Sequence, residues 1–445
     1  MKILFLEVRS KTKLFHELAK EIKKTRQNVE FHWIIQNHAF RLKKEKNIHT
    51  LEYPKIRDFF KENRDSLDIK VSECDRFSLH FNSENWYYTD YRKQLEALFD
   101  RIKPDFVFGE LGNFFTHYSA LISKERKIPF YDIETARFPT GSIGFYQYDE
   151  WNPLKLRDVT DQETEKFLLD FQRKKPVPDY MKKPTSTRKD LLRLRTLQIL
   201  HKLRVLSGYV AGETYCTQNP ITNIFEKRRV KEKIKLWDKY AKTLKEVTRQ
   251  KHKNLLFPLQ MQPEFNLEVW GHPYNNQEKI ILEIAEKLPS DWKLIIKSNP
   301  KSYFELNRLN LGRILEKKNI ILLERSIDMK TLDPHIDIVA TVTGTVQIER
   351  ILTNKPVYVI GNTPFKKYSC INSSIESLTP DDFYGALNNK LQYSQLLEAS
   401  KFLLEHSTPG LMGEPINSIE CMKKENIEKV SLACIKVLEM GSITT

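Results

Sequence analysis

The chain has 445 residues, with 73 lysines and arginines against 58 aspartates and glutamates, and a formal net charge of +15. This length exceeds what one hydrophobic core usually supports, so two domains are expected. A hydrophobic content of 40% excludes a disordered chain. The five cysteines form no CxxC pair, which excludes a zinc ribbon and favours the reducing cytoplasm. No stretch approaches the roughly 20 apolar residues that cross a bilayer.

The predicted elements of the first part alternate between strands and helices. We expect strands at residues 2–7, 30–36, 105–109 and 128–133, and helices at 13–24, 85–101 and after residue 110. Such alternation predicts a parallel sheet with crossover helices. The strand at 2–7 argues against a signal peptide. Residues 40–80 show no clear period and predict no element.

Residues 150–250 are expected to be mostly helical, and the lysines and arginines are concentrated between 174 and 253. A basic protein can bind nucleic acid, an anionic membrane or anionic substrates. The chain has no RNP, helix-turn-helix or zinc-finger signature, so no specific nucleic acid is expected. Two basic segments place apolar side chains at helical spacing. Each is either a solvated helix packed by its apolar side or a helix that lies on anionic lipid.

The second part again alternates. Strands are expected at residues 254–259, 292–297, 320–323, 336–342 and 357–361, with helices at 276–288, 304–317, 329–334 and after residue 345. From residue 380 on, the chain is expected to be largely helical. The fold class is therefore α/β, with two Rossmann-like halves and a helical tail.

The most informative stretch runs from residue 336 to 356: a buried strand, the turn Thr343-Gly344-Thr345, a helix with Glu349, and a Lys-Pro exit. Unpaired N–H groups and threonine hydroxyls at this helix start are predicted to attract a phosphate. Glu349 lies about one helical turn after Thr345 and on the same face, where its carboxylate can accept hydrogen bonds from ribose hydroxyls. The alternative is an ordinary strand-to-helix turn, with Thr345 as a cap and Glu349 in solvent.

These motifs together resemble bacterial capsule and surface-polysaccharide synthesis proteins. The resemblance covers most of residues 254–365, and the motifs follow in the family's order and spacing. They are Phe257-Pro258-Leu259, Gln262-Pro263-Glu264, Gln277 before a long helix, Lys297-x-x-Pro300, Thr343-Gly344-Thr345 with Glu349, and Lys355-Pro356. The family tends to have Gly where this chain has Asn354.

The family includes the capsule Kdo transferases, which use CMP-Kdo and have a GT-B fold of two Rossmann-like domains facing across a cleft. The resemblance implies an N-terminal acceptor-side domain over residues 1–250, with the basic helical insertion at about 150–250. A C-terminal nucleotide-sugar-binding domain would cover 251–415 and a helical tail 416–445. The implied activity moves a sugar from a nucleotide-sugar, CMP-linked rather than UDP-linked, to a surface polysaccharide or its lipid-linked precursor. No further cofactor is implied, and the expected location is the cytoplasm or the inner face of the cell membrane.

By this resemblance, Thr343, Gly344 and Thr345 would hold the donor phosphate and Glu349 the ribose. The nucleotide side of the cleft would also include Pro258, Leu259, Gln260, Lys297, Asn299 and Pro300. Asn299 stands where the family has a histidine, and an asparagine can donate a hydrogen bond but carries no charge and transfers no proton. Lys297 or Lys301 would supply the positive charge. Alternatively, residues 298–300 are a simple strand-ending turn.

Glycosyl transfer needs a base for the acceptor hydroxyl or, in a retaining double displacement, a carboxylate nucleophile. GT-B enzymes usually supply this group from the N-terminal domain. Glu110 is the first candidate, Glu134 the second and Glu7 the third, because each follows an apolar strand. Each is alternatively a helix cap or a salt-bridge partner.

Arg137 is a candidate acceptor-binding residue, since arginine binds carboxylates and phosphates through two hydrogen bonds; alternatively it forms a surface salt bridge. Glu264, after the first strand of the second part, either meets the acceptor or orients its loop. No HExxH, Walker A, GxGxxG or GxSxG motif is present, and no metal site is expected. Two alternatives stay open: a non-catalytic GT-B-like scaffold that binds a glycan or a lipid-linked precursor, and a UDP-sugar epimerase of the same architecture.

Overall fold

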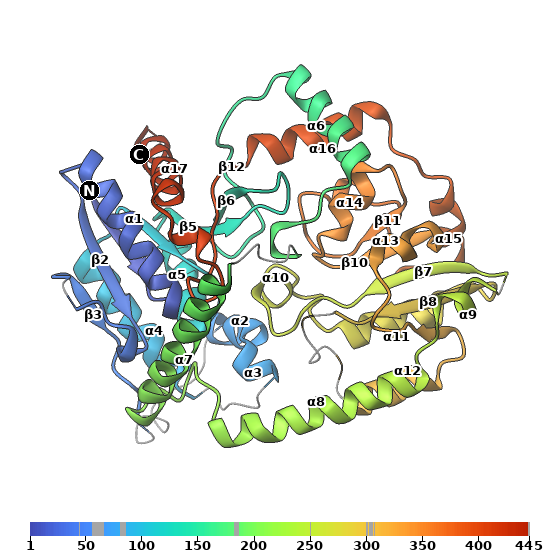
Figure 1. Cartoon of the computed structure of the whole chain (residues 1–445), viewed down its shortest axis with the longest axis horizontal. Coiled ribbons are helices and arrows are strands. Elements are labelled where there is room, and N and C mark those ends of the chain that lie inside the picture. Colours follow the sequence, from blue (N-terminus) through green and yellow to red (C-terminus); the bar gives the residue numbers. More distant parts are fainter. Residues whose placement is uncertain are drawn as a thin grey trace. The chain divides into compact units, whose positions relative to one another are not determined.

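A computed structural model describes the chain except residues 44, 56–65, 81–85, 182–186, 250, 300, 302–305, 307 and 444–445, and the side chains of Tyr180, Arg308, Ser442 and Ile443. The chain forms two compact units, whose elements are labelled in Figure 1. The first unit comprises Met1–Val159, Pro176–Asn219 and Phe402–Thr445. The second comprises Thr160–Lys175 and Pro220–Lys401.

The first unit is built on a seven-stranded sheet in the order β12-β6-β5-β4-β1-β2-β3. Its strands are β1 (Lys2–Leu6), β2 (Glu30–Ile35), β3 (Ile48–Thr50), β4 (Phe106–Gly109), β5 (Phe130–Thr135), β6 (Ser142–Gln147) and β12 (Thr408–Pro409). The strands from β3 to β5 are parallel, whereas β6 runs antiparallel to both β5 and β12. The chain leaves β1 toward β2 and β3 and then returns to β4 on the other side, so the strand order reverses between β1 and β4.

The α-helices of the first unit are α1 (Thr12–Thr25), α2 (Ser66–Cys74), α3 (Arg76–His80), α4 (Tyr88–Ile102), α5 (Phe114–Glu125), α7 (Arg188–Val210) and α17 (Lys424–Ile443). Helix α17 runs beside α1 (Figure 1). The apolar side chains of α1 pack with Val430, Cys434 and Leu438 of α17 in one core. Arg26 also pairs with Glu439. The C-terminal helix is therefore part of the core of the first unit.

The second unit has a five-stranded, all-parallel sheet in the order β11-β10-β7-β8-β9. The strands are β7 (Lys253–Pro258), β8 (Trp292–Lys297), β9 (Ile320–Leu322), β10 (Ile338–Thr341) and β11 (Val357–Val359). Its α-helices are α6 (Asp161–Lys174), α8 (Pro220–Tyr240), α9 (Leu244–Thr248), α10 (Phe265–Glu268), α11 (Gln277–Lys287), α12 (Arg308–Glu316), α13 (Met329–Leu332), α14 (Val346–Leu352), α15 (Pro380–Leu387) and α16 (Tyr393–Glu405). Strand order reverses between β7 and β10.

The expected fold class is confirmed: both halves are α/β, and helices dominate the C-terminal part. All nine predicted strands are present, with ends that differ by up to two residues. The sequence reasoning missed β6, which the turn around Gly141 (φ +77°) joins to β5 as an antiparallel hairpin. It also predicted nothing in 40–80, where β3, α2 and α3 lie.

The units divide the chain differently from the expected boundaries at 250 and 415. Helix α8 belongs to the second unit, where Trp237 Nε1 donates to the carbonyl of Leu323 at 2.9 Å and Arg325 binds Asp238 through two hydrogen bonds. Helix α6 also joins the second unit, through Gln172 and the carbonyl of Leu352. Helix α7 stays with the first unit. The basic helical segment is thus shared between the two units.

Candidate functional site

The donor-site candidates of the second unit lie at the carboxyl ends of β7, β8 and β10, which share one edge because the strands are parallel. Pro258 pairs with Lys297 in the β7–β8 register, and the N–H of Leu259 donates to the Lys297 carbonyl at 2.8 Å. Strand order reverses between β7 and β10, and ligands of open α/β sheets bind at such a reversal. The predicted motifs therefore lie at the edge of the sheet where ligands of such folds bind.

Gln260 joins the end of β7 to the turn after β10. Its side-chain oxygen accepts the N–H groups of Val342 and Thr343 at 3.1 and 2.9 Å, and its amide nitrogen donates to the Thr343 hydroxyl at 2.7 Å. The Thr343 hydroxyl in turn donates to the carbonyl of Asn266, just inside α10. One glutamine thus fixes the turn relative to the strand beside it.

The expectation that the three N–H groups of residues 343–345 are all unpaired is wrong. The Thr343 N–H is taken by Gln260, and the Gly344 N–H donates to the Thr341 hydroxyl at 3.2 Å. A Cβ atom on Gly344 would lie 2.6 Å from that hydroxyl oxygen, so the turn requires glycine for a close approach. Gly344 and Thr343 therefore shape the turn. Thr345 is the N-cap residue of α14 and makes no side-chain capping bond.

Glu349 lies on α14 with its side chain largely withdrawn from water. Burial, with a smaller contribution from Asp333, raises the pKa of Glu349 to about 7, and Lys330 opposes the shift. Among the described residues, its carboxylate has no hydrogen bond or ion pair. The alternative that Glu349 lies in open solvent is wrong, and its contact with a ribose stays a prediction. A desolvated carboxylate of this kind gains most from a partner that donates hydrogen bonds.

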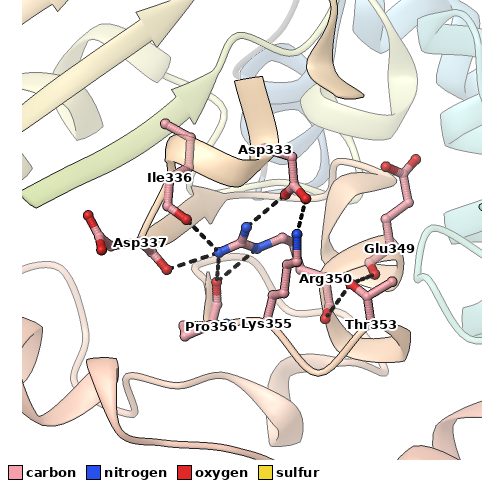
Figure 2. Close-up of polar contacts among 8 residues, drawn as sticks. All are labelled: Asp333, Ile336, Asp337, Glu349, Arg350, Thr353, Lys355 and Pro356. Atoms are coloured by element: carbon pink, nitrogen blue, oxygen red, sulfur yellow. Dashed lines mark hydrogen bonds and ion pairs between the residues drawn. The ribbon is translucent and has the colours of Figure 1, made fainter. Parts of the chain in front are cut away.

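The neighbouring Arg350 points the other way and ties the local backbone together (Figure 2). Its guanidinium binds Asp333 Oδ1 at 2.8 Å and the carbonyls of Ile336, Asp337 and Pro356 at 2.9–3.4 Å. Lys355 contacts the second oxygen of Asp333. Figure 2 also shows the Glu349 carboxylate directed away from this group. Arg350 therefore holds the entries to β10 and β11, while Glu349 stays free of that network.

Lys297 places a cation at the end of β8. Burial lowers the pKa of this lysine, and Asp328 opposes the shift. The ammonium donates to the carbonyl of Arg325 at 3.4 Å, and no other hydrogen bond from it is present in the described part of the chain. Asn299 uses its side-chain oxygen to accept the N–H of Lys301 at 2.9 Å, as in a strand-ending turn. Pro300 lies outside the described residues.

The sequence analysis gave Gln277 no role beyond its place before a helix, and the structure shows why it is there. Its side chain accepts the Gln260 N–H at 2.7 Å and donates to the Gln260 carbonyl and to Gln262 Oε1. Gln262 continues to Glu268 and to the carbonyl of Asn275. The spacing of glutamines in the motifs was the available signal. This buried network orders the loop from which Gln260 projects.

Two further candidates of the second unit lie beside this network. Leu259 packs its side chain in the apolar core, so only its backbone could reach a ligand. Glu264 opens α10 without a side-chain capping bond, and its charge opposes the burial-induced lowering of the Lys301 pKa.

In the first unit, Glu110 and Glu134 meet on one buried lysine, Lys11. The ammonium contacts Glu110 Oε2 and lies 3.1 Å from Glu134 Oε1. Glu110 follows β4, Glu134 lies near the end of β5, and Lys11 directly precedes α1, after β1. All three thus sit where the strand order of the first sheet reverses. The sequence reasoning paired neither glutamate with Lys11, because nothing in the spacing links a residue after β1 to the ends of β4 and β5.

Burial controls the charges in this cluster. It raises the pKa of Glu110, which Lys11 opposes and Glu134 reinforces. Asp132 is a buried residue of β5, and burial followed by repulsion from Glu134 and Glu110 raises its pKa well above the usual range. Burial alone would lower the pKa of Lys11, but the two glutamates outweigh it and the net shift is upward. The group therefore holds a permanent cation, carboxylates able to accept a proton, and a carboxyl that favours its neutral form.

Glu7 and Arg137 are the two remaining candidate residues of the first unit. Glu7 accepts the backbone N–H groups of Arg9 and Asn37, and burial raises its pKa to about 7. These bonds anchor the loops after β1 and β2, which is the structural alternative for Glu7. Arg137 is half-buried in the β5–β6 turn. Its positive charge opposes the rise that burial causes in the pKa of Tyr146.

Comparison with known proteins finds a similar family. Residues 163–369 match the family model described as capsule polysaccharide biosynthesis protein. Across that segment the chain is similar to this family. The matched segment contains Gln260, Lys297, the Thr343-Gly344-Thr345 turn and Glu349. The resemblance recognised from these motifs is confirmed. No curated protein sequence matches the chain.

Solved structures of two kinds are similar to this chain at low scores. A beta Kdo 2,7 transferase, KpsC of Thermosulfurimonas dismutans, has 11% identity, covers 97% of this chain and 99% of its own, and gives a TM-score of 0.38. The beta Kdo 2,4 transferase of the same organism has 12% identity over 67% and 87%, with a TM-score of 0.35. The UDP-GlcNAc 2-epimerase of Neisseria meningitidis, bound to UDP-GlcNAc, has 16% identity over 91% and 99%, with a TM-score of 0.29. These scores are too low to decide between the two activities.

Within the described ranges, no helix is both long enough and apolar enough to pass through a bilayer.

Proposed function

We propose that this chain is a glycosyltransferase that moves a sugar from a nucleotide-sugar to a capsular or other surface polysaccharide, or to its lipid-linked precursor. The family match supports the pathway class. The observation that carries the proposal is Glu349, a carboxylate withdrawn from water with no hydrogen bond from the described residues, beside the reversal point of the second sheet. A nucleotide supplies what this carboxylate lacks, because its ribose has two hydroxyl donors.

The donor phosphate is placed near Thr345 and Lys297. Thr345 is the N-cap residue of α14, and the motif resemblance assigns its hydroxyl to the phosphate. The Lys297 ammonium has donors left after its 3.4 Å contact with the Arg325 carbonyl. A buried lysine with a lowered pKa gains stability from an anion. Gln260 and Gly344 keep the turn in shape, and Pro258 and Leu259 form the adjoining backbone wall. Because Asn299 carries no charge, Lys297 and Lys301 would supply the positive charge that balances the phosphate.

The donor is proposed to be CMP-linked rather than UDP-linked, with an acidic sugar such as Kdo. The motif set that resembles capsule Kdo transferases supports this choice. A CMP-sugar has a single phosphodiester charge, which one lysine can balance. No cofactor other than the nucleotide-sugar is proposed.

The acceptor chemistry is assigned to the Lys11 cluster of the first unit. Glu110 and Glu134 are the candidate base and nucleophile, since both carboxylates pair with the Lys11 ammonium and so lie close together. Lys11 orients both carboxylates, and its charge opposes the effect of burial on the pKa of Glu110. A catalytic carboxylate must be charged to take a proton. Arg137 and Glu264 are proposed acceptor-binding residues. A lipid-linked acceptor places the reaction at the inner face of the cell membrane.

The test measures nucleotide binding and sugar transfer with the full chain. Calorimetry with CMP and with UDP is followed by transfer assays for wild type, Thr345→Val, Glu349→Ala and the exposed control Glu316→Ala. We expect CMP to bind more tightly than UDP, the first two variants to lose transfer with the fold intact, and the control to match wild type. Wild-type turnover in either site variant would contradict the donor site. Epimerisation of UDP-GlcNAc without acceptor would favour the epimerase, and no nucleotide binding would favour the scaffold.

A further inference from the structure

Helix α7 is attached to the first unit along one face only. Leu194 and Gly208 are buried on that face, and a Cβ atom on Gly208 would lie 2.5 Å from the Asn37 side-chain oxygen. His201 and Arg204 lie against the ring of Phe40. The helix therefore already has its packing partner, and its remaining surface needs no contact within the unit.

The opposite face of α7 carries a stripe of exposed apolar side chains. With 3.6 residues per turn, five residues project from one side of the helix within about 60° of each other. Their exposed fractions are 57% for Leu192, 59% for Ile199, 58% for Leu203, 47% for Leu206 and 80% for Val210. Water-soluble monomers seldom expose a continuous apolar patch without an interaction partner. We refer to these five residues as the α7 stripe.

Positive charges border the stripe on both sides. Arg188, Arg195 and Lys202 recur at seven-residue spacing along one border, and Lys189 and Arg193 lie on the other. The one acidic residue of the helix, Asp190, is used at its start in a capping box with Thr187. Apolar side chains between two rows of cations are the pattern of a helix that lies in the plane of an anionic lipid surface.

We propose that α7 is a membrane-contact helix, with its stripe inserted at the acyl boundary of an anionic bilayer and its cations at the phosphate groups. Charge complementarity selects this occupant. A second copy of the chain would bring the same cationic borders together, and the whole chain has a net charge of +15. An anionic lipid surface satisfies the leucines and the cations at once. This inference does not depend on the proposed sugar transfer.

The test is flotation of the full chain with vesicles of phosphatidylcholine alone or mixed with phosphatidylglycerol. The stripe variant is Ile199→Ser/Leu203→Ser/Leu206→Ser, and the matched control is Leu309→Ser/Leu432→Ser, which removes exposed leucines of α12 and α17. We expect wild type and control to float with the anionic vesicles and the stripe variant to bind at least about tenfold more weakly. Unchanged thermal unfolding of the stripe variant shows that it is folded.

A second variant, Arg195→Gln/Lys202→Gln, tests the borders. It should also weaken binding to anionic vesicles, by roughly tenfold or more, and should flatten the dependence of binding on salt. Equal binding of the stripe variant and wild type would overturn the proposal, as would equal wild-type binding to neutral and anionic vesicles. A wild type that ignores vesicles but dimerises in sedimentation velocity, with the stripe variant monomeric, would assign the stripe to self-association instead.

Discussion

The Lys11 ammonium lies 3.1 Å from Glu134 Oε1 while also contacting Glu110 Oε2, so one buried cation holds two carboxylates that come from different strands. The side chain of Lys11 is 5% exposed. A buried cation so placed determines whether its partners are charged, because burial by itself favours the neutral carboxylic acid. The charged form of Glu110 is therefore favoured by Lys11 and opposed by burial.

Replacing Lys11 with methionine should destabilise the first unit, and more so at alkaline pH. Without the ammonium, burial and mutual repulsion raise the folded-state pKa of Glu110 further, so stability is lost as the pH rises from about 4.5 through that value. We expect a loss of about 3–5 kcal/mol near pH 8 and a smaller loss near pH 5, measured by urea unfolding. Lys13→Met, at an exposed position of α1, should lie within about 0.5 kcal/mol of wild type.

Adding Glu110→Gln to Lys11→Met should restore part of the stability at pH 8, since one of the two unpaired charges is removed. A double variant no more stable than Lys11→Met would mean that the lysine acts through packing rather than charge.

Gly344→Ala should destabilise the second unit by about 1–3 kcal/mol, because its Cβ would displace the Thr341 hydroxyl from the turn. The control is Gly312→Ala in α12, where a Cβ meets nothing within 4 Å. Alanine there should leave stability unchanged or raise it by up to about 1 kcal/mol. Chemical unfolding of both variants tests the pair, and equal effects would contradict the close approach at Gly344.

Arg350→Met should cost about 3–5 kcal/mol, since it leaves Asp333 and three carbonyls without their buried donor. Arg313→Met is the exposed control, with a 69% exposed side chain and an expected effect under about 0.5 kcal/mol. Thermal unfolding of the two variants provides the comparison. An Arg350→Met chain as stable as wild type would show that these hydrogen bonds of Arg350 do not stabilise the second unit.

The local sequence pattern predicted the strands and helices around the Thr343-Gly344-Thr345 turn well. It predicted only part of the contacts between side chains. Alternating buried strands and helices are encoded within short windows, so β7, β8 and β10 were found close to their observed bounds. The Gln260–Thr343 and Lys11–Glu134 contacts join residues 83 and 123 positions apart. Such distances are set by strand order, which the sequence pattern does not give.

The same reason explains the wrong expectation about the unpaired N–H groups, and the difference between the expected domains and the compact units. Sequence spacing put three amides at a helix start, but it could not show that Gln260 and Thr341 take two of them. Residues 416–445 were expected to form a helical tail, but the apolar residues of α17 complete the core around α1.

Nucleotide binding should depend on pH through Glu349. A carboxylate must be ionised to accept two ribose hydroxyls, and the pKa of Glu349 is raised to about 7. Affinity for CMP should therefore fall as the pH drops below about 7, by up to tenfold per pH unit, and be constant above it. Glu349→Gln should bind more weakly and show only the pH dependence of the nucleotide itself. Calorimetry across the pH range measures both, and parallel profiles would exclude Glu349 from the ribose contact.

The most direct measurement is a crystal structure of the full chain with CMP. The account predicts ribose hydroxyls within hydrogen-bonding distance of the Glu349 carboxylate, and the phosphate between Thr345 and the Lys297 ammonium. A nucleotide bound at a different edge of the second sheet, or a Glu349 carboxylate covered by protein with no room for a ribose, would contradict the donor site.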